Sequence, residues 1–188
     1  MKVLALTIGK CSGCAILIDD KIVFSSSEER YSRIKSDSSF PVNSINDGLK
    51  YTTLDGKDFD KVIICGNEIN LIPPLINEYS TFSLDDQIQA MDEYWYPNLV
   101  LEENKSFLEI FKNKINVEQF PFNTELGKKL DITKLTRGFS KENQKITSNF
   151  ITQSLSLLLK INEDKIIHME HDSCHAAYGF YGSPIRDD

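Results

Sequence analysis

The chain has little that would mark it as a secreted, membrane-spanning or nucleic-acid-binding protein. Its 188 residues contain only four cysteines, too few for the disulfide framework of a small secreted domain. We therefore expect reduced thiols and a cytoplasmic location. Its apolar runs fall far short of the roughly 18–20 residues that a membrane span needs. The net charge of −7 argues against a surface that binds nucleic acid.

The first third of the chain has the pattern of an α/β protein. Three β-rich runs separated by short turns, over Val3–Ile8, Cys14–Ile18 and Ile22–Ser26, predict a β-meander. Apolar residues at three- and four-residue spacing then predict a helix that begins just after Phe40-Pro41. Lys61–Cys65 has the composition of a short buried strand. This order of elements is typical of an α/β fold and not of a helical bundle or a β-sandwich.

The remainder divides into an irregular stretch and a regular one. Residues 67–140 predict a partly helical insertion, with a helix over Lys105–Ile115 and a packing anchor in Tyr94-Trp95-Tyr96. A long helix is then predicted over Lys141–Lys160, with Ser140 as its N-cap. A final short strand is predicted over residues 165–169. At this length the chain can form one domain with a substantial core.

Two histidines four residues apart, His171 and His175, follow the last predicted strand. If this segment is helical, both imidazoles lie on one face and can bind one divalent metal ion. The spacing alone is a weak signal, because surface histidines often fall four residues apart by chance. His168, inside the predicted strand, is more typical of a histidine satisfied within the fold than of a third ligand.

A short turn between the first two predicted strands begins with Gly9 and ends with Gly13. Such a turn can bring backbone N–H groups close to a phosphate, and the same pattern is typical of an ordinary hairpin. Cys11 and Cys14 form a C-x2-C pair in this turn. We expect them to fill the turn. The alternative is that they join the histidine pair in a closed, structural Cys2His2 zinc site.

A charged stretch, Glu-Glu-Arg-Tyr-Ser-Arg-Ile-Lys, occupies residues 28–35 and is followed by Phe40-Pro41. A charge cluster is by default a solvated loop. This string after a three-strand meander, however, resembles the start of the nodulation-type O-carbamoyltransferases. Members of that family later carry an H-x3-H-A-A segment and then a Ser-Pro pair. The chain has both, in His171, His175, Ala176, Ala177, Ser183 and Pro184. The resemblance covers about residues 1–50 and 162–188.

The resemblance implies a sugar-kinase/actin-like (ribonuclease H-like) α/β half-domain, with residues 1–188 as the first part of an N-terminal metal-binding domain. In that family this domain passes a carbamoyl group from carbamoyl adenylate to a substrate hydroxyl. A separate domain makes the adenylate from ATP and carbamoyl phosphate. The two histidines match the family's metal ligands, so a divalent metal, iron or zinc, is expected. The third ligand and the adenylate-forming domain are not in residues 1–188, so we expect no carbamoyl transfer by these residues alone.

Several polar groups are candidates for contacting a phosphate or nucleotide. The cations of the charged stretch could neutralise phosphate, with Glu28 and Glu29 bracing them. No catalytic residue is assigned. The candidate substrate- or nucleotide-binding residues are Gly9, Ser12, Gly13, Arg30, Arg33 and Lys35.

Three features depart from the family pattern. Cys11-Ser12 stands where the family usually has His-Asp, and Asp172 stands where a further histidine is common. The chain also stops where family members run on, which favours an excised piece. The first departure leaves open a catalytically inactive regulatory module, and the glycine turn leaves open a sugar-kinase-like phosphoryl-transfer ATPase. The expected partner is a small hydroxyl acceptor, sugar-containing or another natural product, without nucleic acid or membrane. Self-association through exposed apolar surface stays open.

Overall fold

The computed structural model describes residues 1–66, 82–114, 131–135 and 140–183. The chain divides into two units. Unit 1 comprises Met1–Ile69 and Ile151–Asp188, and unit 2 comprises Asn70–Phe150. Within the described ranges, none of the helices combines the length and apolar character that a membrane span requires.

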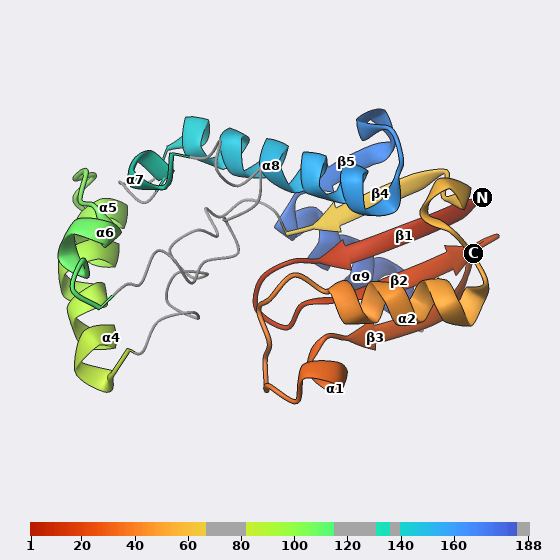
Figure 1. Cartoon of the computed structure of the whole chain (residues 1–188), viewed down its shortest axis with the longest axis horizontal. Coiled ribbons are helices and arrows are strands. Elements are labelled where there is room, and N and C mark those ends of the chain that lie inside the picture. Colours follow the sequence, from red (N-terminus) through yellow and green to blue (C-terminus); the bar gives the residue numbers. More distant parts are fainter. Residues whose placement is uncertain (67–81, 115–130, 136–139, 184–188) are drawn as a thin grey trace. The chain divides into compact units, whose positions relative to one another are not determined.

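Unit 1 is built on a five-stranded mixed sheet with the order β3-β2-β1-β4-β5 (Figure 1). β1 pairs antiparallel with β2, and β2 antiparallel with β3, whereas β4 pairs parallel with both β1 and β5. The predicted meander and both later strands are therefore confirmed, with ends that shift by a single residue at most. The strands are β1 (Lys2–Thr7), β2 (Gly13–Ile18), β3 (Lys21–Ser27), β4 (Lys61–Cys65) and β5 (Ile166–Met169).

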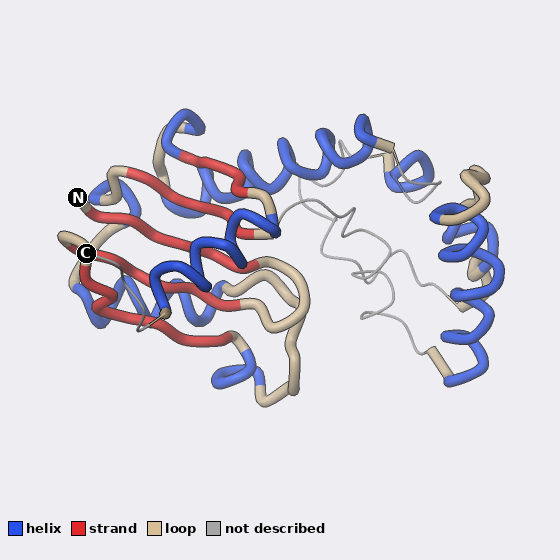
Figure 2. Tube along the Cα trace, turned by 180° about the vertical axis from the view of Figure 1, so that it is seen from behind, coloured by secondary structure: helices blue, strands red, loops and turns tan. Residues whose placement is uncertain are grey.

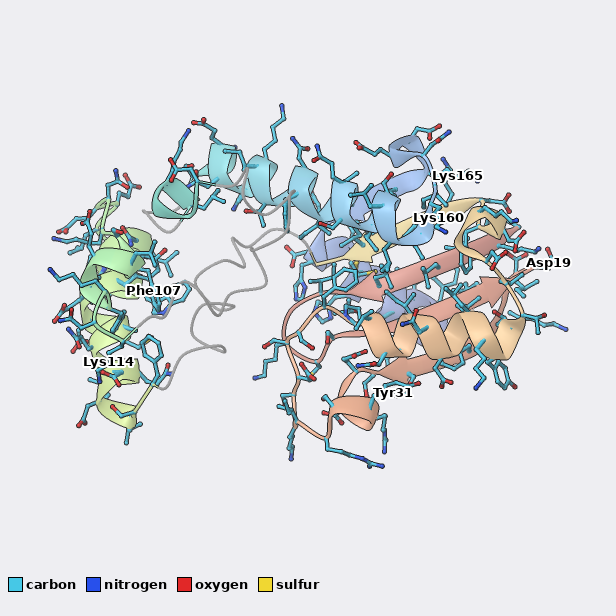
Figure 3. All side chains as sticks on the ribbon, viewed as in Figure 1. Asp19, Tyr31, Phe107, Lys114, Lys160 and Lys165 are labelled. Carbon is cyan, nitrogen blue, oxygen red and sulfur yellow. The ribbon has the colours of Figure 1, made fainter. Side chains whose placement is uncertain are left out.

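The turn between β2 and β3 follows from its sequence. Asp19 and Asp20 both have positive φ, 47° and 67°, as the two central residues of a type I′ turn must. Aspartate tolerates this region better than most residues, and the twist of such a turn matches that of the flanking strands. The carboxylate of Asp19, which is labelled in Figure 3, also pairs with the amino group of Met1 at 2.6 Å.

Four of the five strands end at the same edge of the sheet. β1, β4 and β5 are mutually parallel, and β3 runs with them because it is two antiparallel steps from β1. We call this edge the carboxyl edge. It gathers the turn at residues 8–12, Glu28, Gly66 and the start of the final helix. In open α/β sheets, ligands bind at this kind of edge.

The core of unit 1 lies on one face of the sheet. Helix α2 (Val42–Thr52) packs there, and a Cβ on its Gly48 would lie only 2.9 Å from Ile16 Cδ1. The glycine therefore lets the helix approach the sheet closely. The helix predicted after Phe40-Pro41 is confirmed, and Ile45 is its fully buried apolar contact. The buried sheet residues of this face are Leu4, Leu6, Cys14, Ile16, Val62, Ile64 and Ile166.

The long helix α8 (Lys141–Leu159) agrees with its prediction to within one residue. The Ser140 hydroxyl accepts a hydrogen bond from Asn143 N at 3.1 Å, so the predicted N-cap is confirmed. The apolar side chain of Leu158 is 42% exposed, whereas the polar side chains of Asn143 and Thr147 are buried. A Cβ on Gly56, in the 3-10 turn η1 (Gly56–Asp58), would meet the backbone at the helix end.

Helix α9 (His171–Gly182) crosses the opposite face of the sheet from α2. α9 lies behind the strands in Figure 1 and in front of them in the reverse view of Figure 2. It follows directly from β5, which is preceded by a 3-10 turn, η5 (Glu163–Lys165). The Lys165 ammonium donates to Phe59 O at 2.8 Å and so ties this turn to the segment just before β4. No described residue of α9 is buried, and Tyr178 is 80% exposed.

Unit 2 is helical and has an aromatic core. Tyr94 and Phe107 pack edge-to-face, with ring centroids 5.0 Å apart, and Trp95 packs against the same core. Tyr94 and Trp95 thus confirm the predicted packing anchor, whereas Tyr96 is 53% exposed. The predicted helix Lys105–Ile115 is too long: of its described residues, only Phe107–Ile110 form an α-helix, and Ile115 lies outside the described residues. Among its described residues, the helices are α4 (Leu84–Ala90), the π-helical η2 (Met91–Trp95), α5 (Tyr96–Leu99), α6 (Phe107–Ile110), α7 (Ile132–Leu135) and the first half of α8.

Candidate functional site

The two predicted metal ligands lie together at the start of α9. His171 is the first residue of the helix, and His175 follows one turn later on the same face. Their Nε2 atoms are 2.9 Å apart, and the two rings meet edge-to-face with centroids 4.4 Å apart. Both side chains are exposed. The helical prediction for this segment is confirmed, and the two imidazoles present the same nitrogen to one point.

The geometry of the pair is compatible with a shared metal ion. Two metal–nitrogen bonds of about 2.0–2.1 Å that meet at about 90–110° place the nitrogens about 2.9–3.4 Å apart. The observed separation of 2.9 Å lies at the short end of this range. In the described residues, no group of three or more His, Cys, Asp or Glu side chains is arranged to hold one ion. The assignment of His171 and His175 as metal ligands therefore stays a prediction.

The end of β4 packs against the first turn of α9. Gly66 follows β4 with φ of 81°, and its N–H donates to Met169 O at 3.1 Å. A Cβ on Gly66 would lie 3.2 Å from Nδ1 of His171. Gly66 was not among the residues that the sequence singled out. A glycine directly after a buried strand was the available signal, but the sequence does not show what the glycine faces.

The cysteines beside the histidine pair are Cys65 and Cys174. Cys65 ends β4, and Cys174 lies one residue before His175. Burial, and after it the neighbouring thiol of Cys174, raises the pKa of the Cys65 thiol to about 11. Both thiols are half-buried and free. Their proximity could not be predicted, because more than a hundred residues of chain separate them.

The alternative Cys2His2 zinc site is wrong for the described residues. Cys11 is exposed, at φ of 63°. Cys14 is buried and contacts Ser44 of α2, and burial raises its pKa to about 11. It therefore lies on the face of the sheet that α2 covers, whereas α9 crosses the other face. The four side chains cannot meet at one ion, and Cys14 fills the core as the simpler expectation had it.

Glu28 has a structural role that the sequence analysis did not predict. Its carboxylate is 1% exposed and accepts hydrogen bonds from Ser44 N, Asn43 N and Asn43 Nδ2 at 2.9, 3.1 and 2.6 Å. These backbone groups belong to the first turn of α2, whose N-terminal N–H groups have no partner within the helix. Glu28 therefore caps α2 from a distance, and the expectation that it braces the nearby cations is wrong.

The cations of the charged stretch lie on and after the short helix α1 (Glu29–Ser32), close to the carboxyl edge. Arg30, Arg33 and Lys35 are exposed, and within the described residues none of them forms an ion pair. Glu29 accepts a hydrogen bond from Ser36 N at 2.9 Å instead of bracing them. Their assignment to phosphate binding stays a prediction. The short helix is itself tied to α2 by the Tyr31 hydroxyl, which donates to Asp47 at 2.7 Å (Figure 3).

The glycine turn is closed by backbone contacts. Ser12 N donates to Asp37 O, and Glu28 N donates to Ser12 O, both at 2.9 Å. A Cβ on Gly13 would lie 2.6 Å from Ser26 O, so this position must be glycine for β2 and β3 to pair. Within the described residues the buried Ser12 hydroxyl makes no hydrogen bond. Gly13 is thus explained by packing, and the roles of Gly9 and Ser12 in ligand binding stay predictions.

A family model described as the carbamoyltransferase N-terminus matches residues 5–188 of the chain. The chain belongs to the carbamoyltransferase N-terminus family. The match includes the meander, the charged stretch and the histidine pair, and it implies an enzyme with a carbamoyltransferase-related function. It does not distinguish the nodulation-type subfamily from other members. A comparison with curated proteins found no match.

Membership of the carbamoyltransferase N-terminus family agrees with the observed mixed α/β fold. The sheet joins an antiparallel meander to two parallel strands, and the histidine pair follows the last of these strands. The pair therefore stands at the carboxyl edge, where the ends of β4 and β5 meet. This edge is the candidate active site of the carbamoyltransferase domain.

Proposed function

We propose that the chain is the metal-holding first part of an ATP-dependent O-carbamoyltransferase with an actin-like fold. The observation that carries the proposal is the convergence of two Nε2 atoms, 2.9 Å apart, in a chain that belongs to the carbamoyltransferase N-terminus family. His171 and His175 would hold a divalent metal. When bound, such an ion supplies Lewis acidity towards a carbonyl or phosphate oxygen.

The reaction proposed for the intact protein passes a carbamoyl group from carbamoyl adenylate to an alcohol. The hydroxyl oxygen of the acceptor bonds to the carbamoyl carbon, the bond from that carbon to the phosphate oxygen breaks, and AMP leaves. The hydroxyl proton goes to a base. The exposed cations Arg30, Arg33 and Lys35 are suited to attracting the anionic adenylate towards the carboxyl edge, because they are not neutralised by acids of the described residues.

Metal binding by the chain tests the first element of the proposal. The wild-type chain is expected to bind one Zn²⁺ or Co²⁺, measured by titration in competition with a chelator. His171→Ala and His175→Ala should each weaken binding by more than the roughly 10–100-fold that loss of an outer contact costs. His168→Gln is the matched control, because His168 faces α8 and should leave the affinity unchanged. Equal metal affinity in the wild type and all three variants would contradict the proposed metal site.

Donor binding distinguishes the proposal from its rivals. A non-hydrolysable carbamoyl-adenylate analogue and ATP with Mg²⁺ are titrated into the metal-loaded chain by calorimetry. Binding of the analogue that weakens in His171→Ala supports the carbamoyltransferase. Binding of Mg-ATP that does not depend on the histidines supports a sugar-kinase-like ATPase. Analogue binding without any dependence on metal supports a regulatory module.

A further inference from the structure

The geometry points to Gly66 as a positioning residue for the metal site: its lack of a side chain sets the orientation of the His171 imidazole. This inference rests on the proposed metal-binding function of the histidine pair. Gly66 contributes no ligand atom. It acts through His171, and the observations that carry the inference are its backbone conformation, its hydrogen bond to β5 and the space beside its α-carbon.

The backbone of Gly66 joins the ends of two neighbouring strands. Its N–H donates to Met169 O at 3.1 Å, which extends the parallel pairing of β4 and β5 by one step beyond Cys65. The φ of 81° is a conformation that residues with a side chain rarely adopt. His171 begins α9 two residues after Met169. The bond therefore holds the start of the helix beside the glycine.

The imidazole of His171 fills the space that a side chain on Gly66 would occupy. A Cβ there would lie 3.2 Å from Nδ1, closer than an ordinary van der Waals contact of about 3.4–4 Å. The glycine thus allows the Nδ1 side of the ring to lie against the end of β4. The other ring nitrogen, Nε2, is then the one directed at His175, 2.9 Å away.

A methyl group at this position would disturb the pair without removing either ligand. The His171 ring would have to move by a few tenths of an ångström, or the backbone of Gly66 would have to shift. Metal–ligand distances in proteins hold to about ±0.2 Å, so a movement of this size matters. Loss of an outer contact that orients a ligating histidine typically costs 10–100-fold in metal affinity.

Three variants of the full chain test this role. Gly66→Ala and Gly66→Asn both introduce a Cβ, but asparagine tolerates positive φ better than alanine does. Gly179→Ala is the matched control. It adds a methyl group to α9, the helix that carries both histidines, at a position where a Cβ would have no other atom within 4 Å. The probe is Co²⁺, whose affinity is measured by chelator competition and whose visible spectrum reports its ligand geometry. Circular dichroism and thermal unfolding of the metal-free proteins report folding.

We expect both Gly66 variants to bind Co²⁺ about tenfold or more weakly than wild type, with an altered spectrum, while Gly179→Ala binds as wild type. Wild-type affinity in both Gly66 variants would overturn the inference and leave the metal site standing. Loss in Gly66→Ala but not in Gly66→Asn would overturn it too, because backbone strain and not the contact would then be responsible. If the wild-type chain itself binds no Co²⁺, the metal site fails and the role of Gly66 fails with it.

Discussion

The Thr152 hydroxyl lies 2.7 Å from Nε2 of His168, and this contact joins α8 to β5. Burial lowers the pKa of His168 below its ordinary value near 6.5. The position of His168 inside a predicted strand indicated a histidine satisfied within the fold and not a third metal ligand. The contact agrees with that expectation, because the ring faces α8 while the other two histidines belong to α9.

The lowered pKa of His168 predicts a loss of stability in mild acid. Between the folded and unfolded pKa values the unfolded chain binds more protons, so the free energy of unfolding falls as pH drops below about 6.5 and is fully retained above it. His168→Gln should flatten this part of the curve. Urea unfolding between about pH 5 and pH 7.5 measures it. An identical pH dependence in wild type and His168→Gln would contradict the assignment.

Removal of the Glu28 carboxylate should destabilise unit 1. Glu28→Ala leaves the N–H groups of Asn43 and Ser44 without their acceptor in a buried place. We expect a loss of about 2–3 kcal/mol in the free energy of unfolding. Glu163→Ala, at an exposed position of the same unit, is the control and should change it by less than about 0.5 kcal/mol. Chemical denaturation followed by circular dichroism compares the two, and equal effects would refute a capping role.

The Asp86 carboxylate stabilises unit 2. It pairs with Lys114 and accepts hydrogen bonds from Ser83 N and Ser83 Oγ, both at 2.8 Å. The ion pair is the main reason that the pKa of Asp86 falls to about 2, with the serine bonds second. A carboxyl whose pKa is lowered on folding stabilises above its unfolded pKa of about 3.9, and this contribution disappears as pH falls from about 4 towards 2.

Asp86→Asn should therefore lower the unfolding midpoint of unit 2 at neutral pH and remove its acid sensitivity in that range. Trp95 is the only tryptophan of the chain and packs in the core of this unit, so its fluorescence reports the transition. Asp92→Asn, an exposed change in η2, is the control. The prediction fails if both variants unfold at the wild-type midpoint.

The four thiols should differ in reactivity. Cys14 and Cys65 have pKa values raised to about 11, chiefly by burial, so little thiolate is present at neutral pH. Cys11 is exposed. Alkylation with iodoacetamide, followed by mass spectrometry, should modify Cys11 first, the half-buried Cys65 more slowly, and the buried Cys14 only after unfolding. If Cys14 reacts as fast as Cys11 in the folded chain, the buried position of Cys14 is contradicted.

Local patterns predicted the elements of unit 1 well and those of unit 2 poorly. The meander, α2 and α8 follow from alternation, helical spacing and the Ser140 cap, which depend on neighbours in the sequence. The predicted helix Lys105–Ile115 was too long, because the described chain turns after Ile110, and Phe111 enters the core from that turn. Apolar periodicity does not distinguish a short helix plus a turn from one longer helix. Much of the predicted insertion, residues 67–81, 115–130 and 136–139, lies outside the described residues.

The candidate site was predicted in part. The histidine spacing and the family pattern singled out His171 and His175, and helical geometry then places the two rings on one face. The part played by Gly66 and the proximity of Cys65 and Cys174 were not predicted, nor was the capping role of Glu28. Each of these contacts joins residues far apart in the sequence or on different elements.

The amino-acid sequence alone determined which segments of unit 1 form strands and helices, and it placed two imidazoles one helical turn apart, because these properties depend on a few consecutive residues. Only the tertiary structure decided what those segments bring together. The parallel pairing of β4 with β5 sets Gly66 against His171, and the packing of α2 over the meander directs the Glu28 carboxylate to a helix end instead of to its neighbouring arginines. Contacts of this kind depend on the direction in which a folded strand or helix presents each side chain, which sequence spacing does not encode.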